Sequence, residues 1–333
     1  MAPIILPRIS DQKPLVSVVS ITYNHEPYIR DCLEGFLMQK TDFPVEIIIH
    51  DDASTDHTAD IIREYYEKRP DLFHVIIERE NQYSQHKKIM TPLYKQAKGK
   101  YIALCEGDDY WTDPLKLQKQ FDILERNSDY IGVVHRFDVV NKQGTPENIE
   151  TFGYYEKKNR GIYTLYDFEK DTHLPSHVAT LMFKNIFRGE SNKIIYPECL
   201  EKNLCPGDMK LFFLLLLHGN IYRLKDKMSA YRYVREKGGN SWTSRRIGNC
   251  NPYQTWINIK DLEYIAKGYQ KELDFRKRKL DIESTFIIVA IKKRNLAYMK
   301  HLIQYLVFQK QALAFLPKTI IELTIEFCKR LNK

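Results

Sequence analysis

The chain has few cysteines, and none of them are arranged in a pair. Six of its 333 residues are cysteine, and no CxxC motif occurs. Cys32 and Cys105 stand within apolar segments, where free thiols are usually buried. Disulfide frameworks and zinc sites both depend on regularly spaced cysteines. The pattern therefore predicts reduced thiols of an intracellular protein.

Long hydrophobic runs are also missing. The apolar stretch at residues 286–291 is far shorter than the roughly 20 residues that a membrane-spanning helix needs. Residues 1–14 contain Ile4, Ile5 and Leu6 but no hydrophobic region of a signal peptide. We therefore expect a cytoplasmic protein without a spanning helix.

Glycine-rich phosphate-binding motifs are absent as well. Neither GxGxxG nor GxxxxGK(S/T) occurs, so dinucleotide-binding and P-loop folds lose their strongest sequence support. No zinc-finger, RNA-recognition or helix-turn-helix signature is present. No nucleic-acid partner is expected.

Positive charge is concentrated at the C-terminal end. The whole chain carries a net charge of +8, but residues 267–333 hold 15 Lys/Arg and only 6 Asp/Glu. The sequence before them is close to neutral. Apolar residues in this tail recur at helical spacing, including Leu296, Met299 and Leu306. Two interpretations stay open: packing on the body of the protein or on a partner subunit in a homo-oligomer, and peripheral contact with the inner face of a membrane.

Hydrophobic periodicity predicts alternating strands and helices over the first third of the chain. Four runs rich in β-branched residues indicate buried parallel strands, and amphipathic segments between them indicate helices. Ser54 or Thr55 is expected to cap the second helix. This order favours an α/β fold with a mostly parallel sheet that is covered on both faces. The strands are expected at residues 15–22, 45–50, 72–77 and 100–105.

Polar clusters follow three of these strands. They are Thr22 to Asn24, Asp51 with Asp52, and the acidic run from Glu106 to Asp109. Parallel strands bring such clusters to one edge of a sheet, where α/β proteins bind ligands. Three carboxylates in four residues repel one another, and a divalent cation bound to phosphate oxygens would relieve that repulsion. The sequence therefore predicts a metal-diphosphate site.

Three motifs carry a resemblance to a known family. Residues 18–24, 49–56 and 105–111, followed by Pro114 and Leu117, resemble those of the inverting, nucleotide-sugar-dependent glycosyltransferases of family 2. The resemblance covers roughly residues 15–245. It implies a GT-A fold within a catalytic domain at residues 1–245, with a nucleotide-binding half at about 15–127 and a mixed acceptor half at about 128–245. Residues 246–333 would form a basic, helical C-terminal region.

The resemblance also implies residue roles in nucleotide binding. Asp52 would accept the ring N–H of uracil, and Asp51 would hold its loop or a ribose hydroxyl. An Asx-turn or a helix cap is the structural alternative for this loop. Thr22, Tyr23 and Asn24 would line the base pocket. Glu26 would help there or serve only as an acid at a helix start.

The acidic run resembles the family's Asp-x-Asp-Asp motif, with Glu106 in place of the first Asp. Glu106, Gly107 and Asp108 are assigned to nucleotide binding, and Asp108 and Asp109 to the metal. Gly107 would let the backbone approach the diphosphate closely, and Glu106 could reach the ribose, the metal or neither. Oxygen-only ligands suit Mg²⁺ or Mn²⁺, and the sequence does not choose between them. A UDP-sugar is the implied donor.

Downstream segments supply the remaining candidates. Asp208 matches the acid that serves the family as catalytic base, although an N-cap is its structural alternative. His177 is placed near donor or acceptor, or else on the surface as a hydrogen-bonding loop residue. A mobile basic loop is assigned to Arg235, Lys237 and Trp242, and Arg232 just before it could instead form an ion pair at a strand end.

The leading hypothesis is a metal-dependent inverting glycosyltransferase. It would transfer sugar from a UDP-sugar to a saccharide hydroxyl, on a glycolipid acceptor or another glycan of surface polysaccharide. One alternative is a sugar-nucleotide pyrophosphorylase, but residues 22–27 lack the Gly, Lys and Arg that its triphosphate loop requires. A second alternative is a non-catalytic UDP-binding scaffold.

Overall fold

The computed structural model describes residues 2–149, 161–171, 173–188, 206–234, 252–276 and 278–279. The chain divides into two compact units. The larger comprises Met1–Phe168, His173–Glu198 and Gly207–Arg245, and the smaller comprises Glu169–Thr172, Cys199–Pro206 and Arg246–Lys333. All elements that build the candidate site belong to the larger unit.

Four parallel strands form the N-terminal half of the sheet, as the periodicity predicts. They are β2 (Val16–Thr22), β3 (Val45–Asp51), β4 (Phe73–Ile77) and β5 (Tyr101–Leu104). The strand order is β4-β3-β2-β5, so the chain reverses its direction across the sheet between β4 and β5. Strands β2 and β3 pair over their full length, from Val16 opposite Val45 to Thr22 opposite Asp51. Their carboxyl ends are therefore level.

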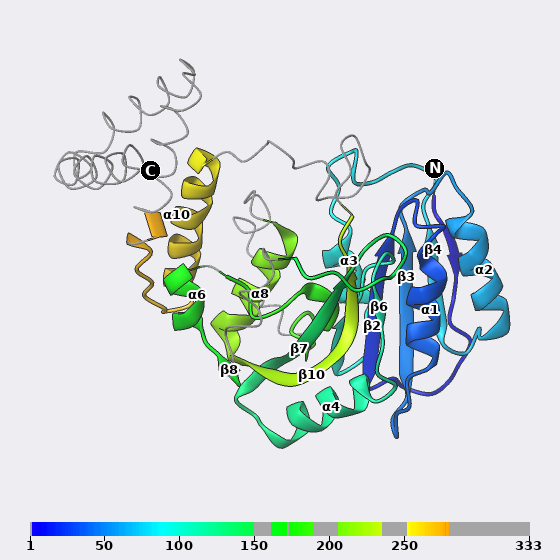
Figure 1. Cartoon of the computed structure of the whole chain (residues 1–333), viewed down its shortest axis with the longest axis horizontal. Coiled ribbons are helices and arrows are strands. Elements are labelled where there is room, and N and C mark those ends of the chain that lie inside the picture. The colour runs from blue at the N-terminus through cyan, green and yellow to red at the C-terminus, as the bar shows by residue number, and fades with distance from the viewer. Residues whose placement is uncertain are drawn as a thin grey trace, which may run out of the picture. The chain divides into compact units, whose positions relative to one another are not determined.

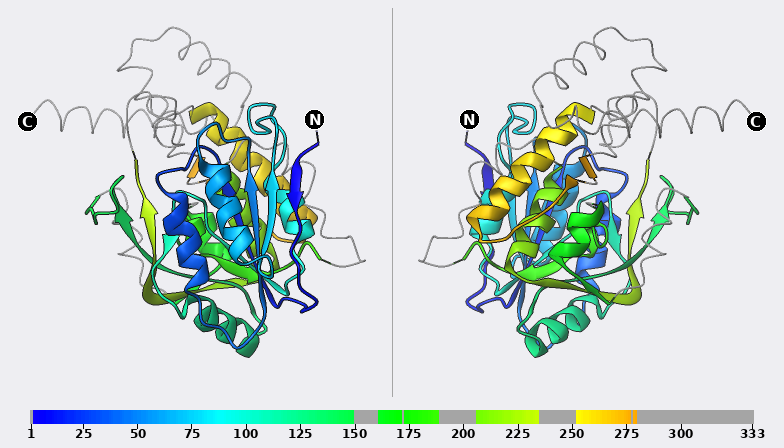
Figure 2. Two further views of the ribbon diagram at one scale, coloured as in Figure 1. Left: turned by 90° about the vertical axis from the view of Figure 1, so that its right-hand side faces the viewer. Right: turned by 90° about the vertical axis from the view of Figure 1, so that its left-hand side faces the viewer.

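Helices cover both faces of this half. Successive side chains of β2, β3 and β4 point to opposite faces of the sheet. The side chains on one face pack with α1 (Ile29–Leu37) and α2 (Thr58–Lys68) in a continuous apolar core. Helix α3 (Met90–Gln96) follows β4 and contacts β2. Figure 2 shows α1 and α2 side by side over the strands, with α3 on the other side of the sheet.

The sheet then continues in mixed orientation. Strand β9 (Met182–Lys184) lies antiparallel between β5 and β7 (Tyr130–Val140). Strand β10 (Asn220–Arg232) runs parallel to β7, and irregular register along the pair accompanies the curvature seen in Figure 1. The short strands β6 (Tyr110–Trp111) and β8 (Ile162–Tyr163) pair with β10, and β1 (Ile4–Leu6) pairs with β4.

The remaining helices are α4 (Lys116–Arg126), α6 (Leu165–Asp171), α8 (Gly207–His218) and α10 (Pro252–Gly268), with a 3-10 turn, η2, at Val178–Thr180. Every residue of α8 from Leu211 to Leu217 is buried, which explains a helix that is apolar on all sides. No helix among the described residues has the length and hydropathy to cross a membrane. The apolar tail positions Leu296, Met299 and Leu306 lie outside the described residues.

Helix α2 begins later than its sequence suggests. Its first residue is Thr58, whereas Ser54 or Thr55 was expected to cap it. The Ser54 hydroxyl instead bonds to the Asp51 carboxylate, and the Asp56 carboxylate accepts the Thr58 N–H at 3.0 Å. The expected cap is wrong because these side chains are used to hold the preceding loop.

A buried lysine lies in helix α4, at a position that the sequence does not mark as unusual. Lys116 has no exposed surface. Its Nζ donates to Gln120 Oε1 at 2.8 Å and lies 3.9 Å from the centre of the Trp111 ring. The Gln120 amide in turn donates to the carbonyls of Val133 and Thr180, both at 2.8 Å. Burial lowers the pKa of Lys116 from 10.5 to about 7.

This lowered pKa makes stability depend on pH in a defined direction. Between about pH 7 and 10 the unfolded chain holds a proton on Lys116 that the folded chain has lost. Stability therefore rises with pH through this window, by up to about 1.4 kcal/mol per pH unit. Relative to Lys116→Met, the free energy of unfolding of the wild type should climb between pH 7 and 9, as measured by chemical denaturation.

Lys119→Met provides the control on the same helix. Hydrogen bonds to Asp113 and Asp226 raise the pKa of Lys119, so this residue does not titrate in that window. The wild type and Lys119→Met should differ by a constant amount over pH 7 to 9. If the free energies of unfolding of the wild type and Lys116→Met change in parallel over pH 7 to 9, the lowered pKa of Lys116 is contradicted.

Candidate functional site

The three predicted polar clusters do meet at one edge of the sheet. The Asp52 N–H donates to the Thr22 carbonyl at 2.9 Å, and the Gly107 N–H donates to the Ile21 carbonyl at 2.9 Å. The ends of β2, β3 and β5 are thus joined by backbone hydrogen bonds. Loops from these three strands surround a single location, as expected for a ligand site of an α/β sheet.

Side chains cross-link the first two loops. Asn24, in the left-handed region with a φ of 54°, donates its N–H to Ser54 Oγ at 2.9 Å and accepts the Thr55 N–H at 2.8 Å. Glu26 accepts the His57 N–H at 3.1 Å. Asn24 and Glu26 therefore fix the loop that follows β3, in addition to any contact with a base.

Asp51 and Asp52 are both buried but face different partners. Both Asp51 carboxylate oxygens accept hydrogen bonds from Ser54, which assigns this side chain to loop support. Burial raises the pKa of Asp51. The Asp52 carboxylate accepts the N–H groups of Gln82 at 2.7 Å and Tyr83 at 3.0 Å. The loop after β4 thereby orients Asp52, a contact that the sequence does not reveal.

The acidic loop forms the centre of the site. Ligand oxygens of Glu106, Asp108 and Asp109 all lie within 4.8 Å of one another. Burial, followed by the charges of Asp108 and Asp208, raises the pKa of Glu106 to about 8. The charge of Asp208, in the first turn of α8, therefore reaches this cluster from a distant part of the sequence.

Asp109 supplies the observation that tests whether a cation fits. Its carboxylate is fully buried, and Oδ1 accepts the Arg232 N–H at 2.8 Å. Oδ2 is buried without a hydrogen-bond partner. Burial and the neighbouring Asp108 raise the pKa of Asp109. An unpartnered carboxylate oxygen beside two further acids is a donor set that suits a hard divalent cation, so these residues fit the predicted metal.

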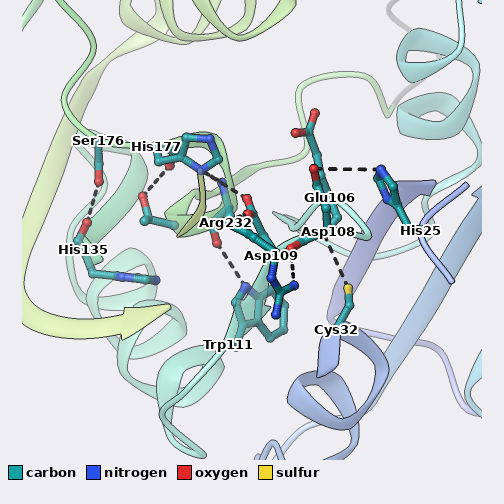
Figure 3. Close-up of polar contacts among 12 residues, drawn as sticks. His25, Cys32, Glu106, Asp108, Asp109, Trp111, His135, Ser176, His177 and Arg232 are labelled. Carbon is teal, nitrogen blue, oxygen red and sulfur yellow. Dashed lines mark hydrogen bonds and ion pairs between the residues drawn. The ribbon is translucent and has the colours of Figure 1, made fainter. Parts of the chain in front are cut away.

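Two histidines flank the acids, one on each side (Figure 3). His25 Nε2 lies 3.8 Å from Asp108 Oδ2, and His177 Nδ1 lies 3.5 Å from Asp109 Oδ2. His177 Nδ1 also accepts the Ala179 N–H at 3.3 Å, and burial lowers the pKa of His177 to about 4. His177 is therefore neutral near pH 7, and its contact with Asp109 is not an ion pair.

Gly107 lies where a larger residue would not fit. A Cβ at this position would approach Thr22 Cβ and Oγ1 to 2.8 Å and His25 Nδ1 to 3.0 Å. Thr22 Oγ1 and His25 Nδ1 are both buried and lack hydrogen-bond partners. His25 is not part of the predicted site, although its place in the sequence between Asn24 and Glu26 was a signal.

The structural alternatives considered for Asp208 and Arg232 differ in their outcome. Asp208 does not precede α8 as an N-cap but lies in its first turn, where Oδ1 accepts the Met209 N–H at 2.7 Å. Arg232 forms the ion pair considered for it, with Asp31 at 2.8 Å. Arg235, Lys237 and Trp242 lie outside the described residues, so their assignment stays a prediction.

Comparison with known sequences identifies relatives of the chain. Residues 17–188 match the family model for glycosyl transferase family 2. The uncharacterized protein Rv1520 of Mycobacterium tuberculosis is 35% identical over 224 residues, which cover 65% of this chain and 58% of that protein. The chain therefore spans well under two thirds of this relative's length.

Two named enzymes are also similar. TuaG of Bacillus subtilis, named as a glycosyltransferase of teichuronic acid biosynthesis, is 27% identical over 255 residues, or 76% of this chain and 90% of TuaG. TarS of Staphylococcus aureus, a poly(ribitol-phosphate) β-N-acetylglucosaminyltransferase, is 30% identical over 247 residues, or 72% of this chain and 38% of TarS.

Solved structures confirm the predicted GT-A fold. TarS 1–349 in complex with UDP-GlcNAc has a TM-score of 0.52 at 18% identity, covering 82% of this chain and 71% of that one. The mannosyltransferase PcManGT of Pyrobaculum calidifontis, in complex with GDP-Man and Mn²⁺, has a TM-score of 0.50 at 18% identity, covering 96% and 84%. The family model spans just over half of the sequence and includes all three polar clusters. This chain is a member of glycosyltransferase family 2.

Proposed function

We propose that this protein transfers a sugar from a UDP-sugar to a saccharide hydroxyl, with inversion at the anomeric carbon and with Mn²⁺ or Mg²⁺ as cofactor. One observation carries the proposal: Glu106, Asp108 and Asp109 lie together, with an unpartnered oxygen on Asp109, and the charge of Asp208 raises the pKa of Glu106 further. Family membership supports the reaction class. It counts against the pyrophosphorylase alternative.

The nucleotide would bind across the ends of β2, β3 and β5. Asp52 is oriented by two backbone N–H groups, and each of its oxygens retains a lone pair for the ring N–H of uracil. Thr22 and Tyr23 would line the base pocket, which Asn24 and Glu26 hold in shape. Asp51 would support its loop by hydrogen bonds with Ser54 and would not contact the ribose.

Asp108 and Asp109 would hold the metal, and Glu106 would lie beside the diphosphate. When bound, the cation supplies charge that stabilises the departing diphosphate. Because Gly107 has no side chain, its backbone lies close to β2 and His25, and the acidic loop packs closely against the end of β2.

Asp208 would act as the general base. In an inverting transfer one carboxylate removes the proton of the acceptor hydroxyl while that oxygen attacks the anomeric carbon from the face opposite the diphosphate. No enzyme nucleophile is required. Asp208 lies in the first turn of α8, whose apolar remainder is buried, and its charge acts on Glu106, which supports this role. His177 would contact donor or acceptor beside Asp109.

The acceptor is proposed from the relatives. TuaG and TarS are named for teichuronic acid and poly(ribitol-phosphate), which are polymers of the cell surface. We infer an acceptor of the same class, a saccharide or polyol hydroxyl on a growing surface polymer, including a lipid-linked one. Arg235, Lys237 and Trp242 are proposed to approach the diphosphate, and residues 267–333 to contact a membrane surface or a partner subunit.

Substitution of the two key acids should separate binding from catalysis. With Mn²⁺ and a panel of UDP-sugars, the purified protein should release UDP from at least one donor. Asp108→Asn should lose both Mn²⁺-dependent UDP binding and turnover. Asp208→Asn should keep UDP binding in calorimetry and lose about 10²- to 10⁴-fold in kcat, because only general-base catalysis is removed.

Asp226→Asn is a matched control, since Asp226 pairs with Lys119 on the surface at 2.9 Å. It should retain wild-type turnover. Full transfer by both Asp108→Asn and Asp208→Asn would refute the site assignment. Binding of UDP without release from any donor would favour a scaffold, and pyrophosphate release from UTP with a sugar phosphate would favour a pyrophosphorylase.

Gly107→Ala tests the close approach of the acidic loop to β2. The new Cβ would displace Thr22, His25 or the loop itself, because its contacts would be 2.8 to 3.0 Å. A shift of about 1 Å in the loop should lower kcat/KM by about 100-fold. In contrast, Gly268→Ala should have no effect, since a Cβ at this position would extend into open space. Wild-type kcat/KM in Gly107→Ala would count against the tight packing of this loop.

A further inference from the structure

Arg232 reaches the acidic loop through its side chain. The residue is 5% exposed and stands at the carboxyl end of β10, far in sequence from the loop. Its guanidinium donates from Nη1 to the Asp108 carbonyl oxygen at 2.6 Å and from Nη2 to Asp31 Oδ2 at 2.8 Å. One rigid planar group thus bridges the acidic loop and the start of α1.

The backbone of the same residue holds the next acid. The Arg232 N–H donates to Asp109 Oδ1 at 2.8 Å, which leaves Oδ2 as the oxygen without a hydrogen-bond partner. Asp108 and Asp109 are therefore fixed by two different groups of one residue. Figure 3 shows Arg232 placed against both of these acids.

Two aromatic rings lie close to the guanidinium of Arg232. Its carbon lies 4.5 Å from the centre of the Tyr28 ring and 5.2 Å from that of Tyr110. Cations are favoured against aromatic faces, and this contact strengthens when water is excluded. The two rings therefore help to hold the guanidinium in the place from which it donates to the Asp108 carbonyl.

An ion pair with Asp31 would not by itself explain this arrangement. The Asp31 side chain is 54% exposed, whereas that of Arg232 is 2% exposed. Half-exposed ion pairs contribute little to stability, and burying an arginine for such a pair alone would cost more than it returns. The buried position of Arg232 is explained by its additional hydrogen bonds to Asp108 and Asp109.

We propose that Arg232 is a positioning residue for the metal-binding acids: it fixes the Asp108 backbone and the Asp109 carboxylate so that the free oxygens of both acids face one point. The inference rests on the proposed metal-dependent function. Arg232 acts through these acids and does not itself touch the metal.

Mn²⁺ binding in the presence of UDP tests the proposal without relying on turnover. The electron paramagnetic resonance signal of free Mn²⁺ reports its affinity for the full-length protein. Arg232→Lys keeps the charge and the backbone N–H but cannot bridge the Asp108 carbonyl and Asp31 together. We expect its Mn²⁺ affinity to fall about 10- to 100-fold, as for other residues that orient metal ligands. At saturating Mn²⁺ it should recover most of the wild-type kcat.

Two further variants sharpen the test. Arg223→Lys makes the same change at another buried arginine of β10, which is 8% exposed, and should leave Mn²⁺ affinity unchanged. Asp31→Asn removes only the half-exposed anchor and should weaken Mn²⁺ binding about two- to fivefold. If Arg232→Lys does not fold, Asp31→Asn decides the question.

The outcomes separate the two proposals. If the wild type binds Mn²⁺ and UDP, and both Arg232→Lys and Asp31→Asn bind Mn²⁺ equally well, only the role of Arg232 is refuted. If Arg232→Lys lowers kcat at saturating Mn²⁺ but leaves Mn²⁺ affinity intact, the positioning role is also refuted. If the wild type binds no Mn²⁺ with UDP, the proposed metal-dependent function fails, and the inference fails with it.

Discussion

Electrostatic repulsion among the carboxylates at the end of β5 is the constraint on which the rest of the site depends. Ligand oxygens of Glu106, Asp108 and Asp109 lie within 4.8 Å of one another, and the charge of Asp208 also acts on Glu106. Burial and this crowding raise the pKa of Glu106 and of Asp109. Such a cluster is costly in a folded protein unless something binds it, which is why it points to function more than to stability.

The protein holds this cluster by hydrogen bonds from elements far apart in sequence. Strand β2 accepts the Gly107 N–H, and β10 supplies the backbone N–H that bonds to Asp109. The guanidinium of Arg232 lies close to two tyrosine rings and donates to the Asp108 carbonyl. The loops after β2 and β3 are likewise tied to each other through Asn24 and Ser54. A site fixed in this way is organised before ligands arrive, and binding then costs less conformational entropy.

The sequence was most informative where structure is local. Buried parallel strands are continuous apolar runs, so β2, β3, β4 and β5 were predicted to within two residues. It did not place the short strand β6, where two residues carry no periodicity. It also missed Lys116, because nothing in a helical pattern shows that an amine will lie over Trp111 and beside Gln120. The cap of α2 was wrong for a related reason, since Ser54 had a partner in another loop.

The features of the candidate site also fall into those that the sequence could predict and those that it could not. The motifs by themselves determined the family, the parallel sheet and the acids that cluster at its edge, because these features depend on residue type and order along the chain. Only the tertiary structure decided that Asp52 is oriented by Gln82 and Tyr83, that Asp51 supports a loop, that His25 and His177 flank the acids, and that Arg232 holds two of them. Those contacts join residues 30 to 124 positions apart or depend on which oxygen is already bonded. Such partnerships follow from how the sheet brings loops together, and no local pattern in the sequence encodes them.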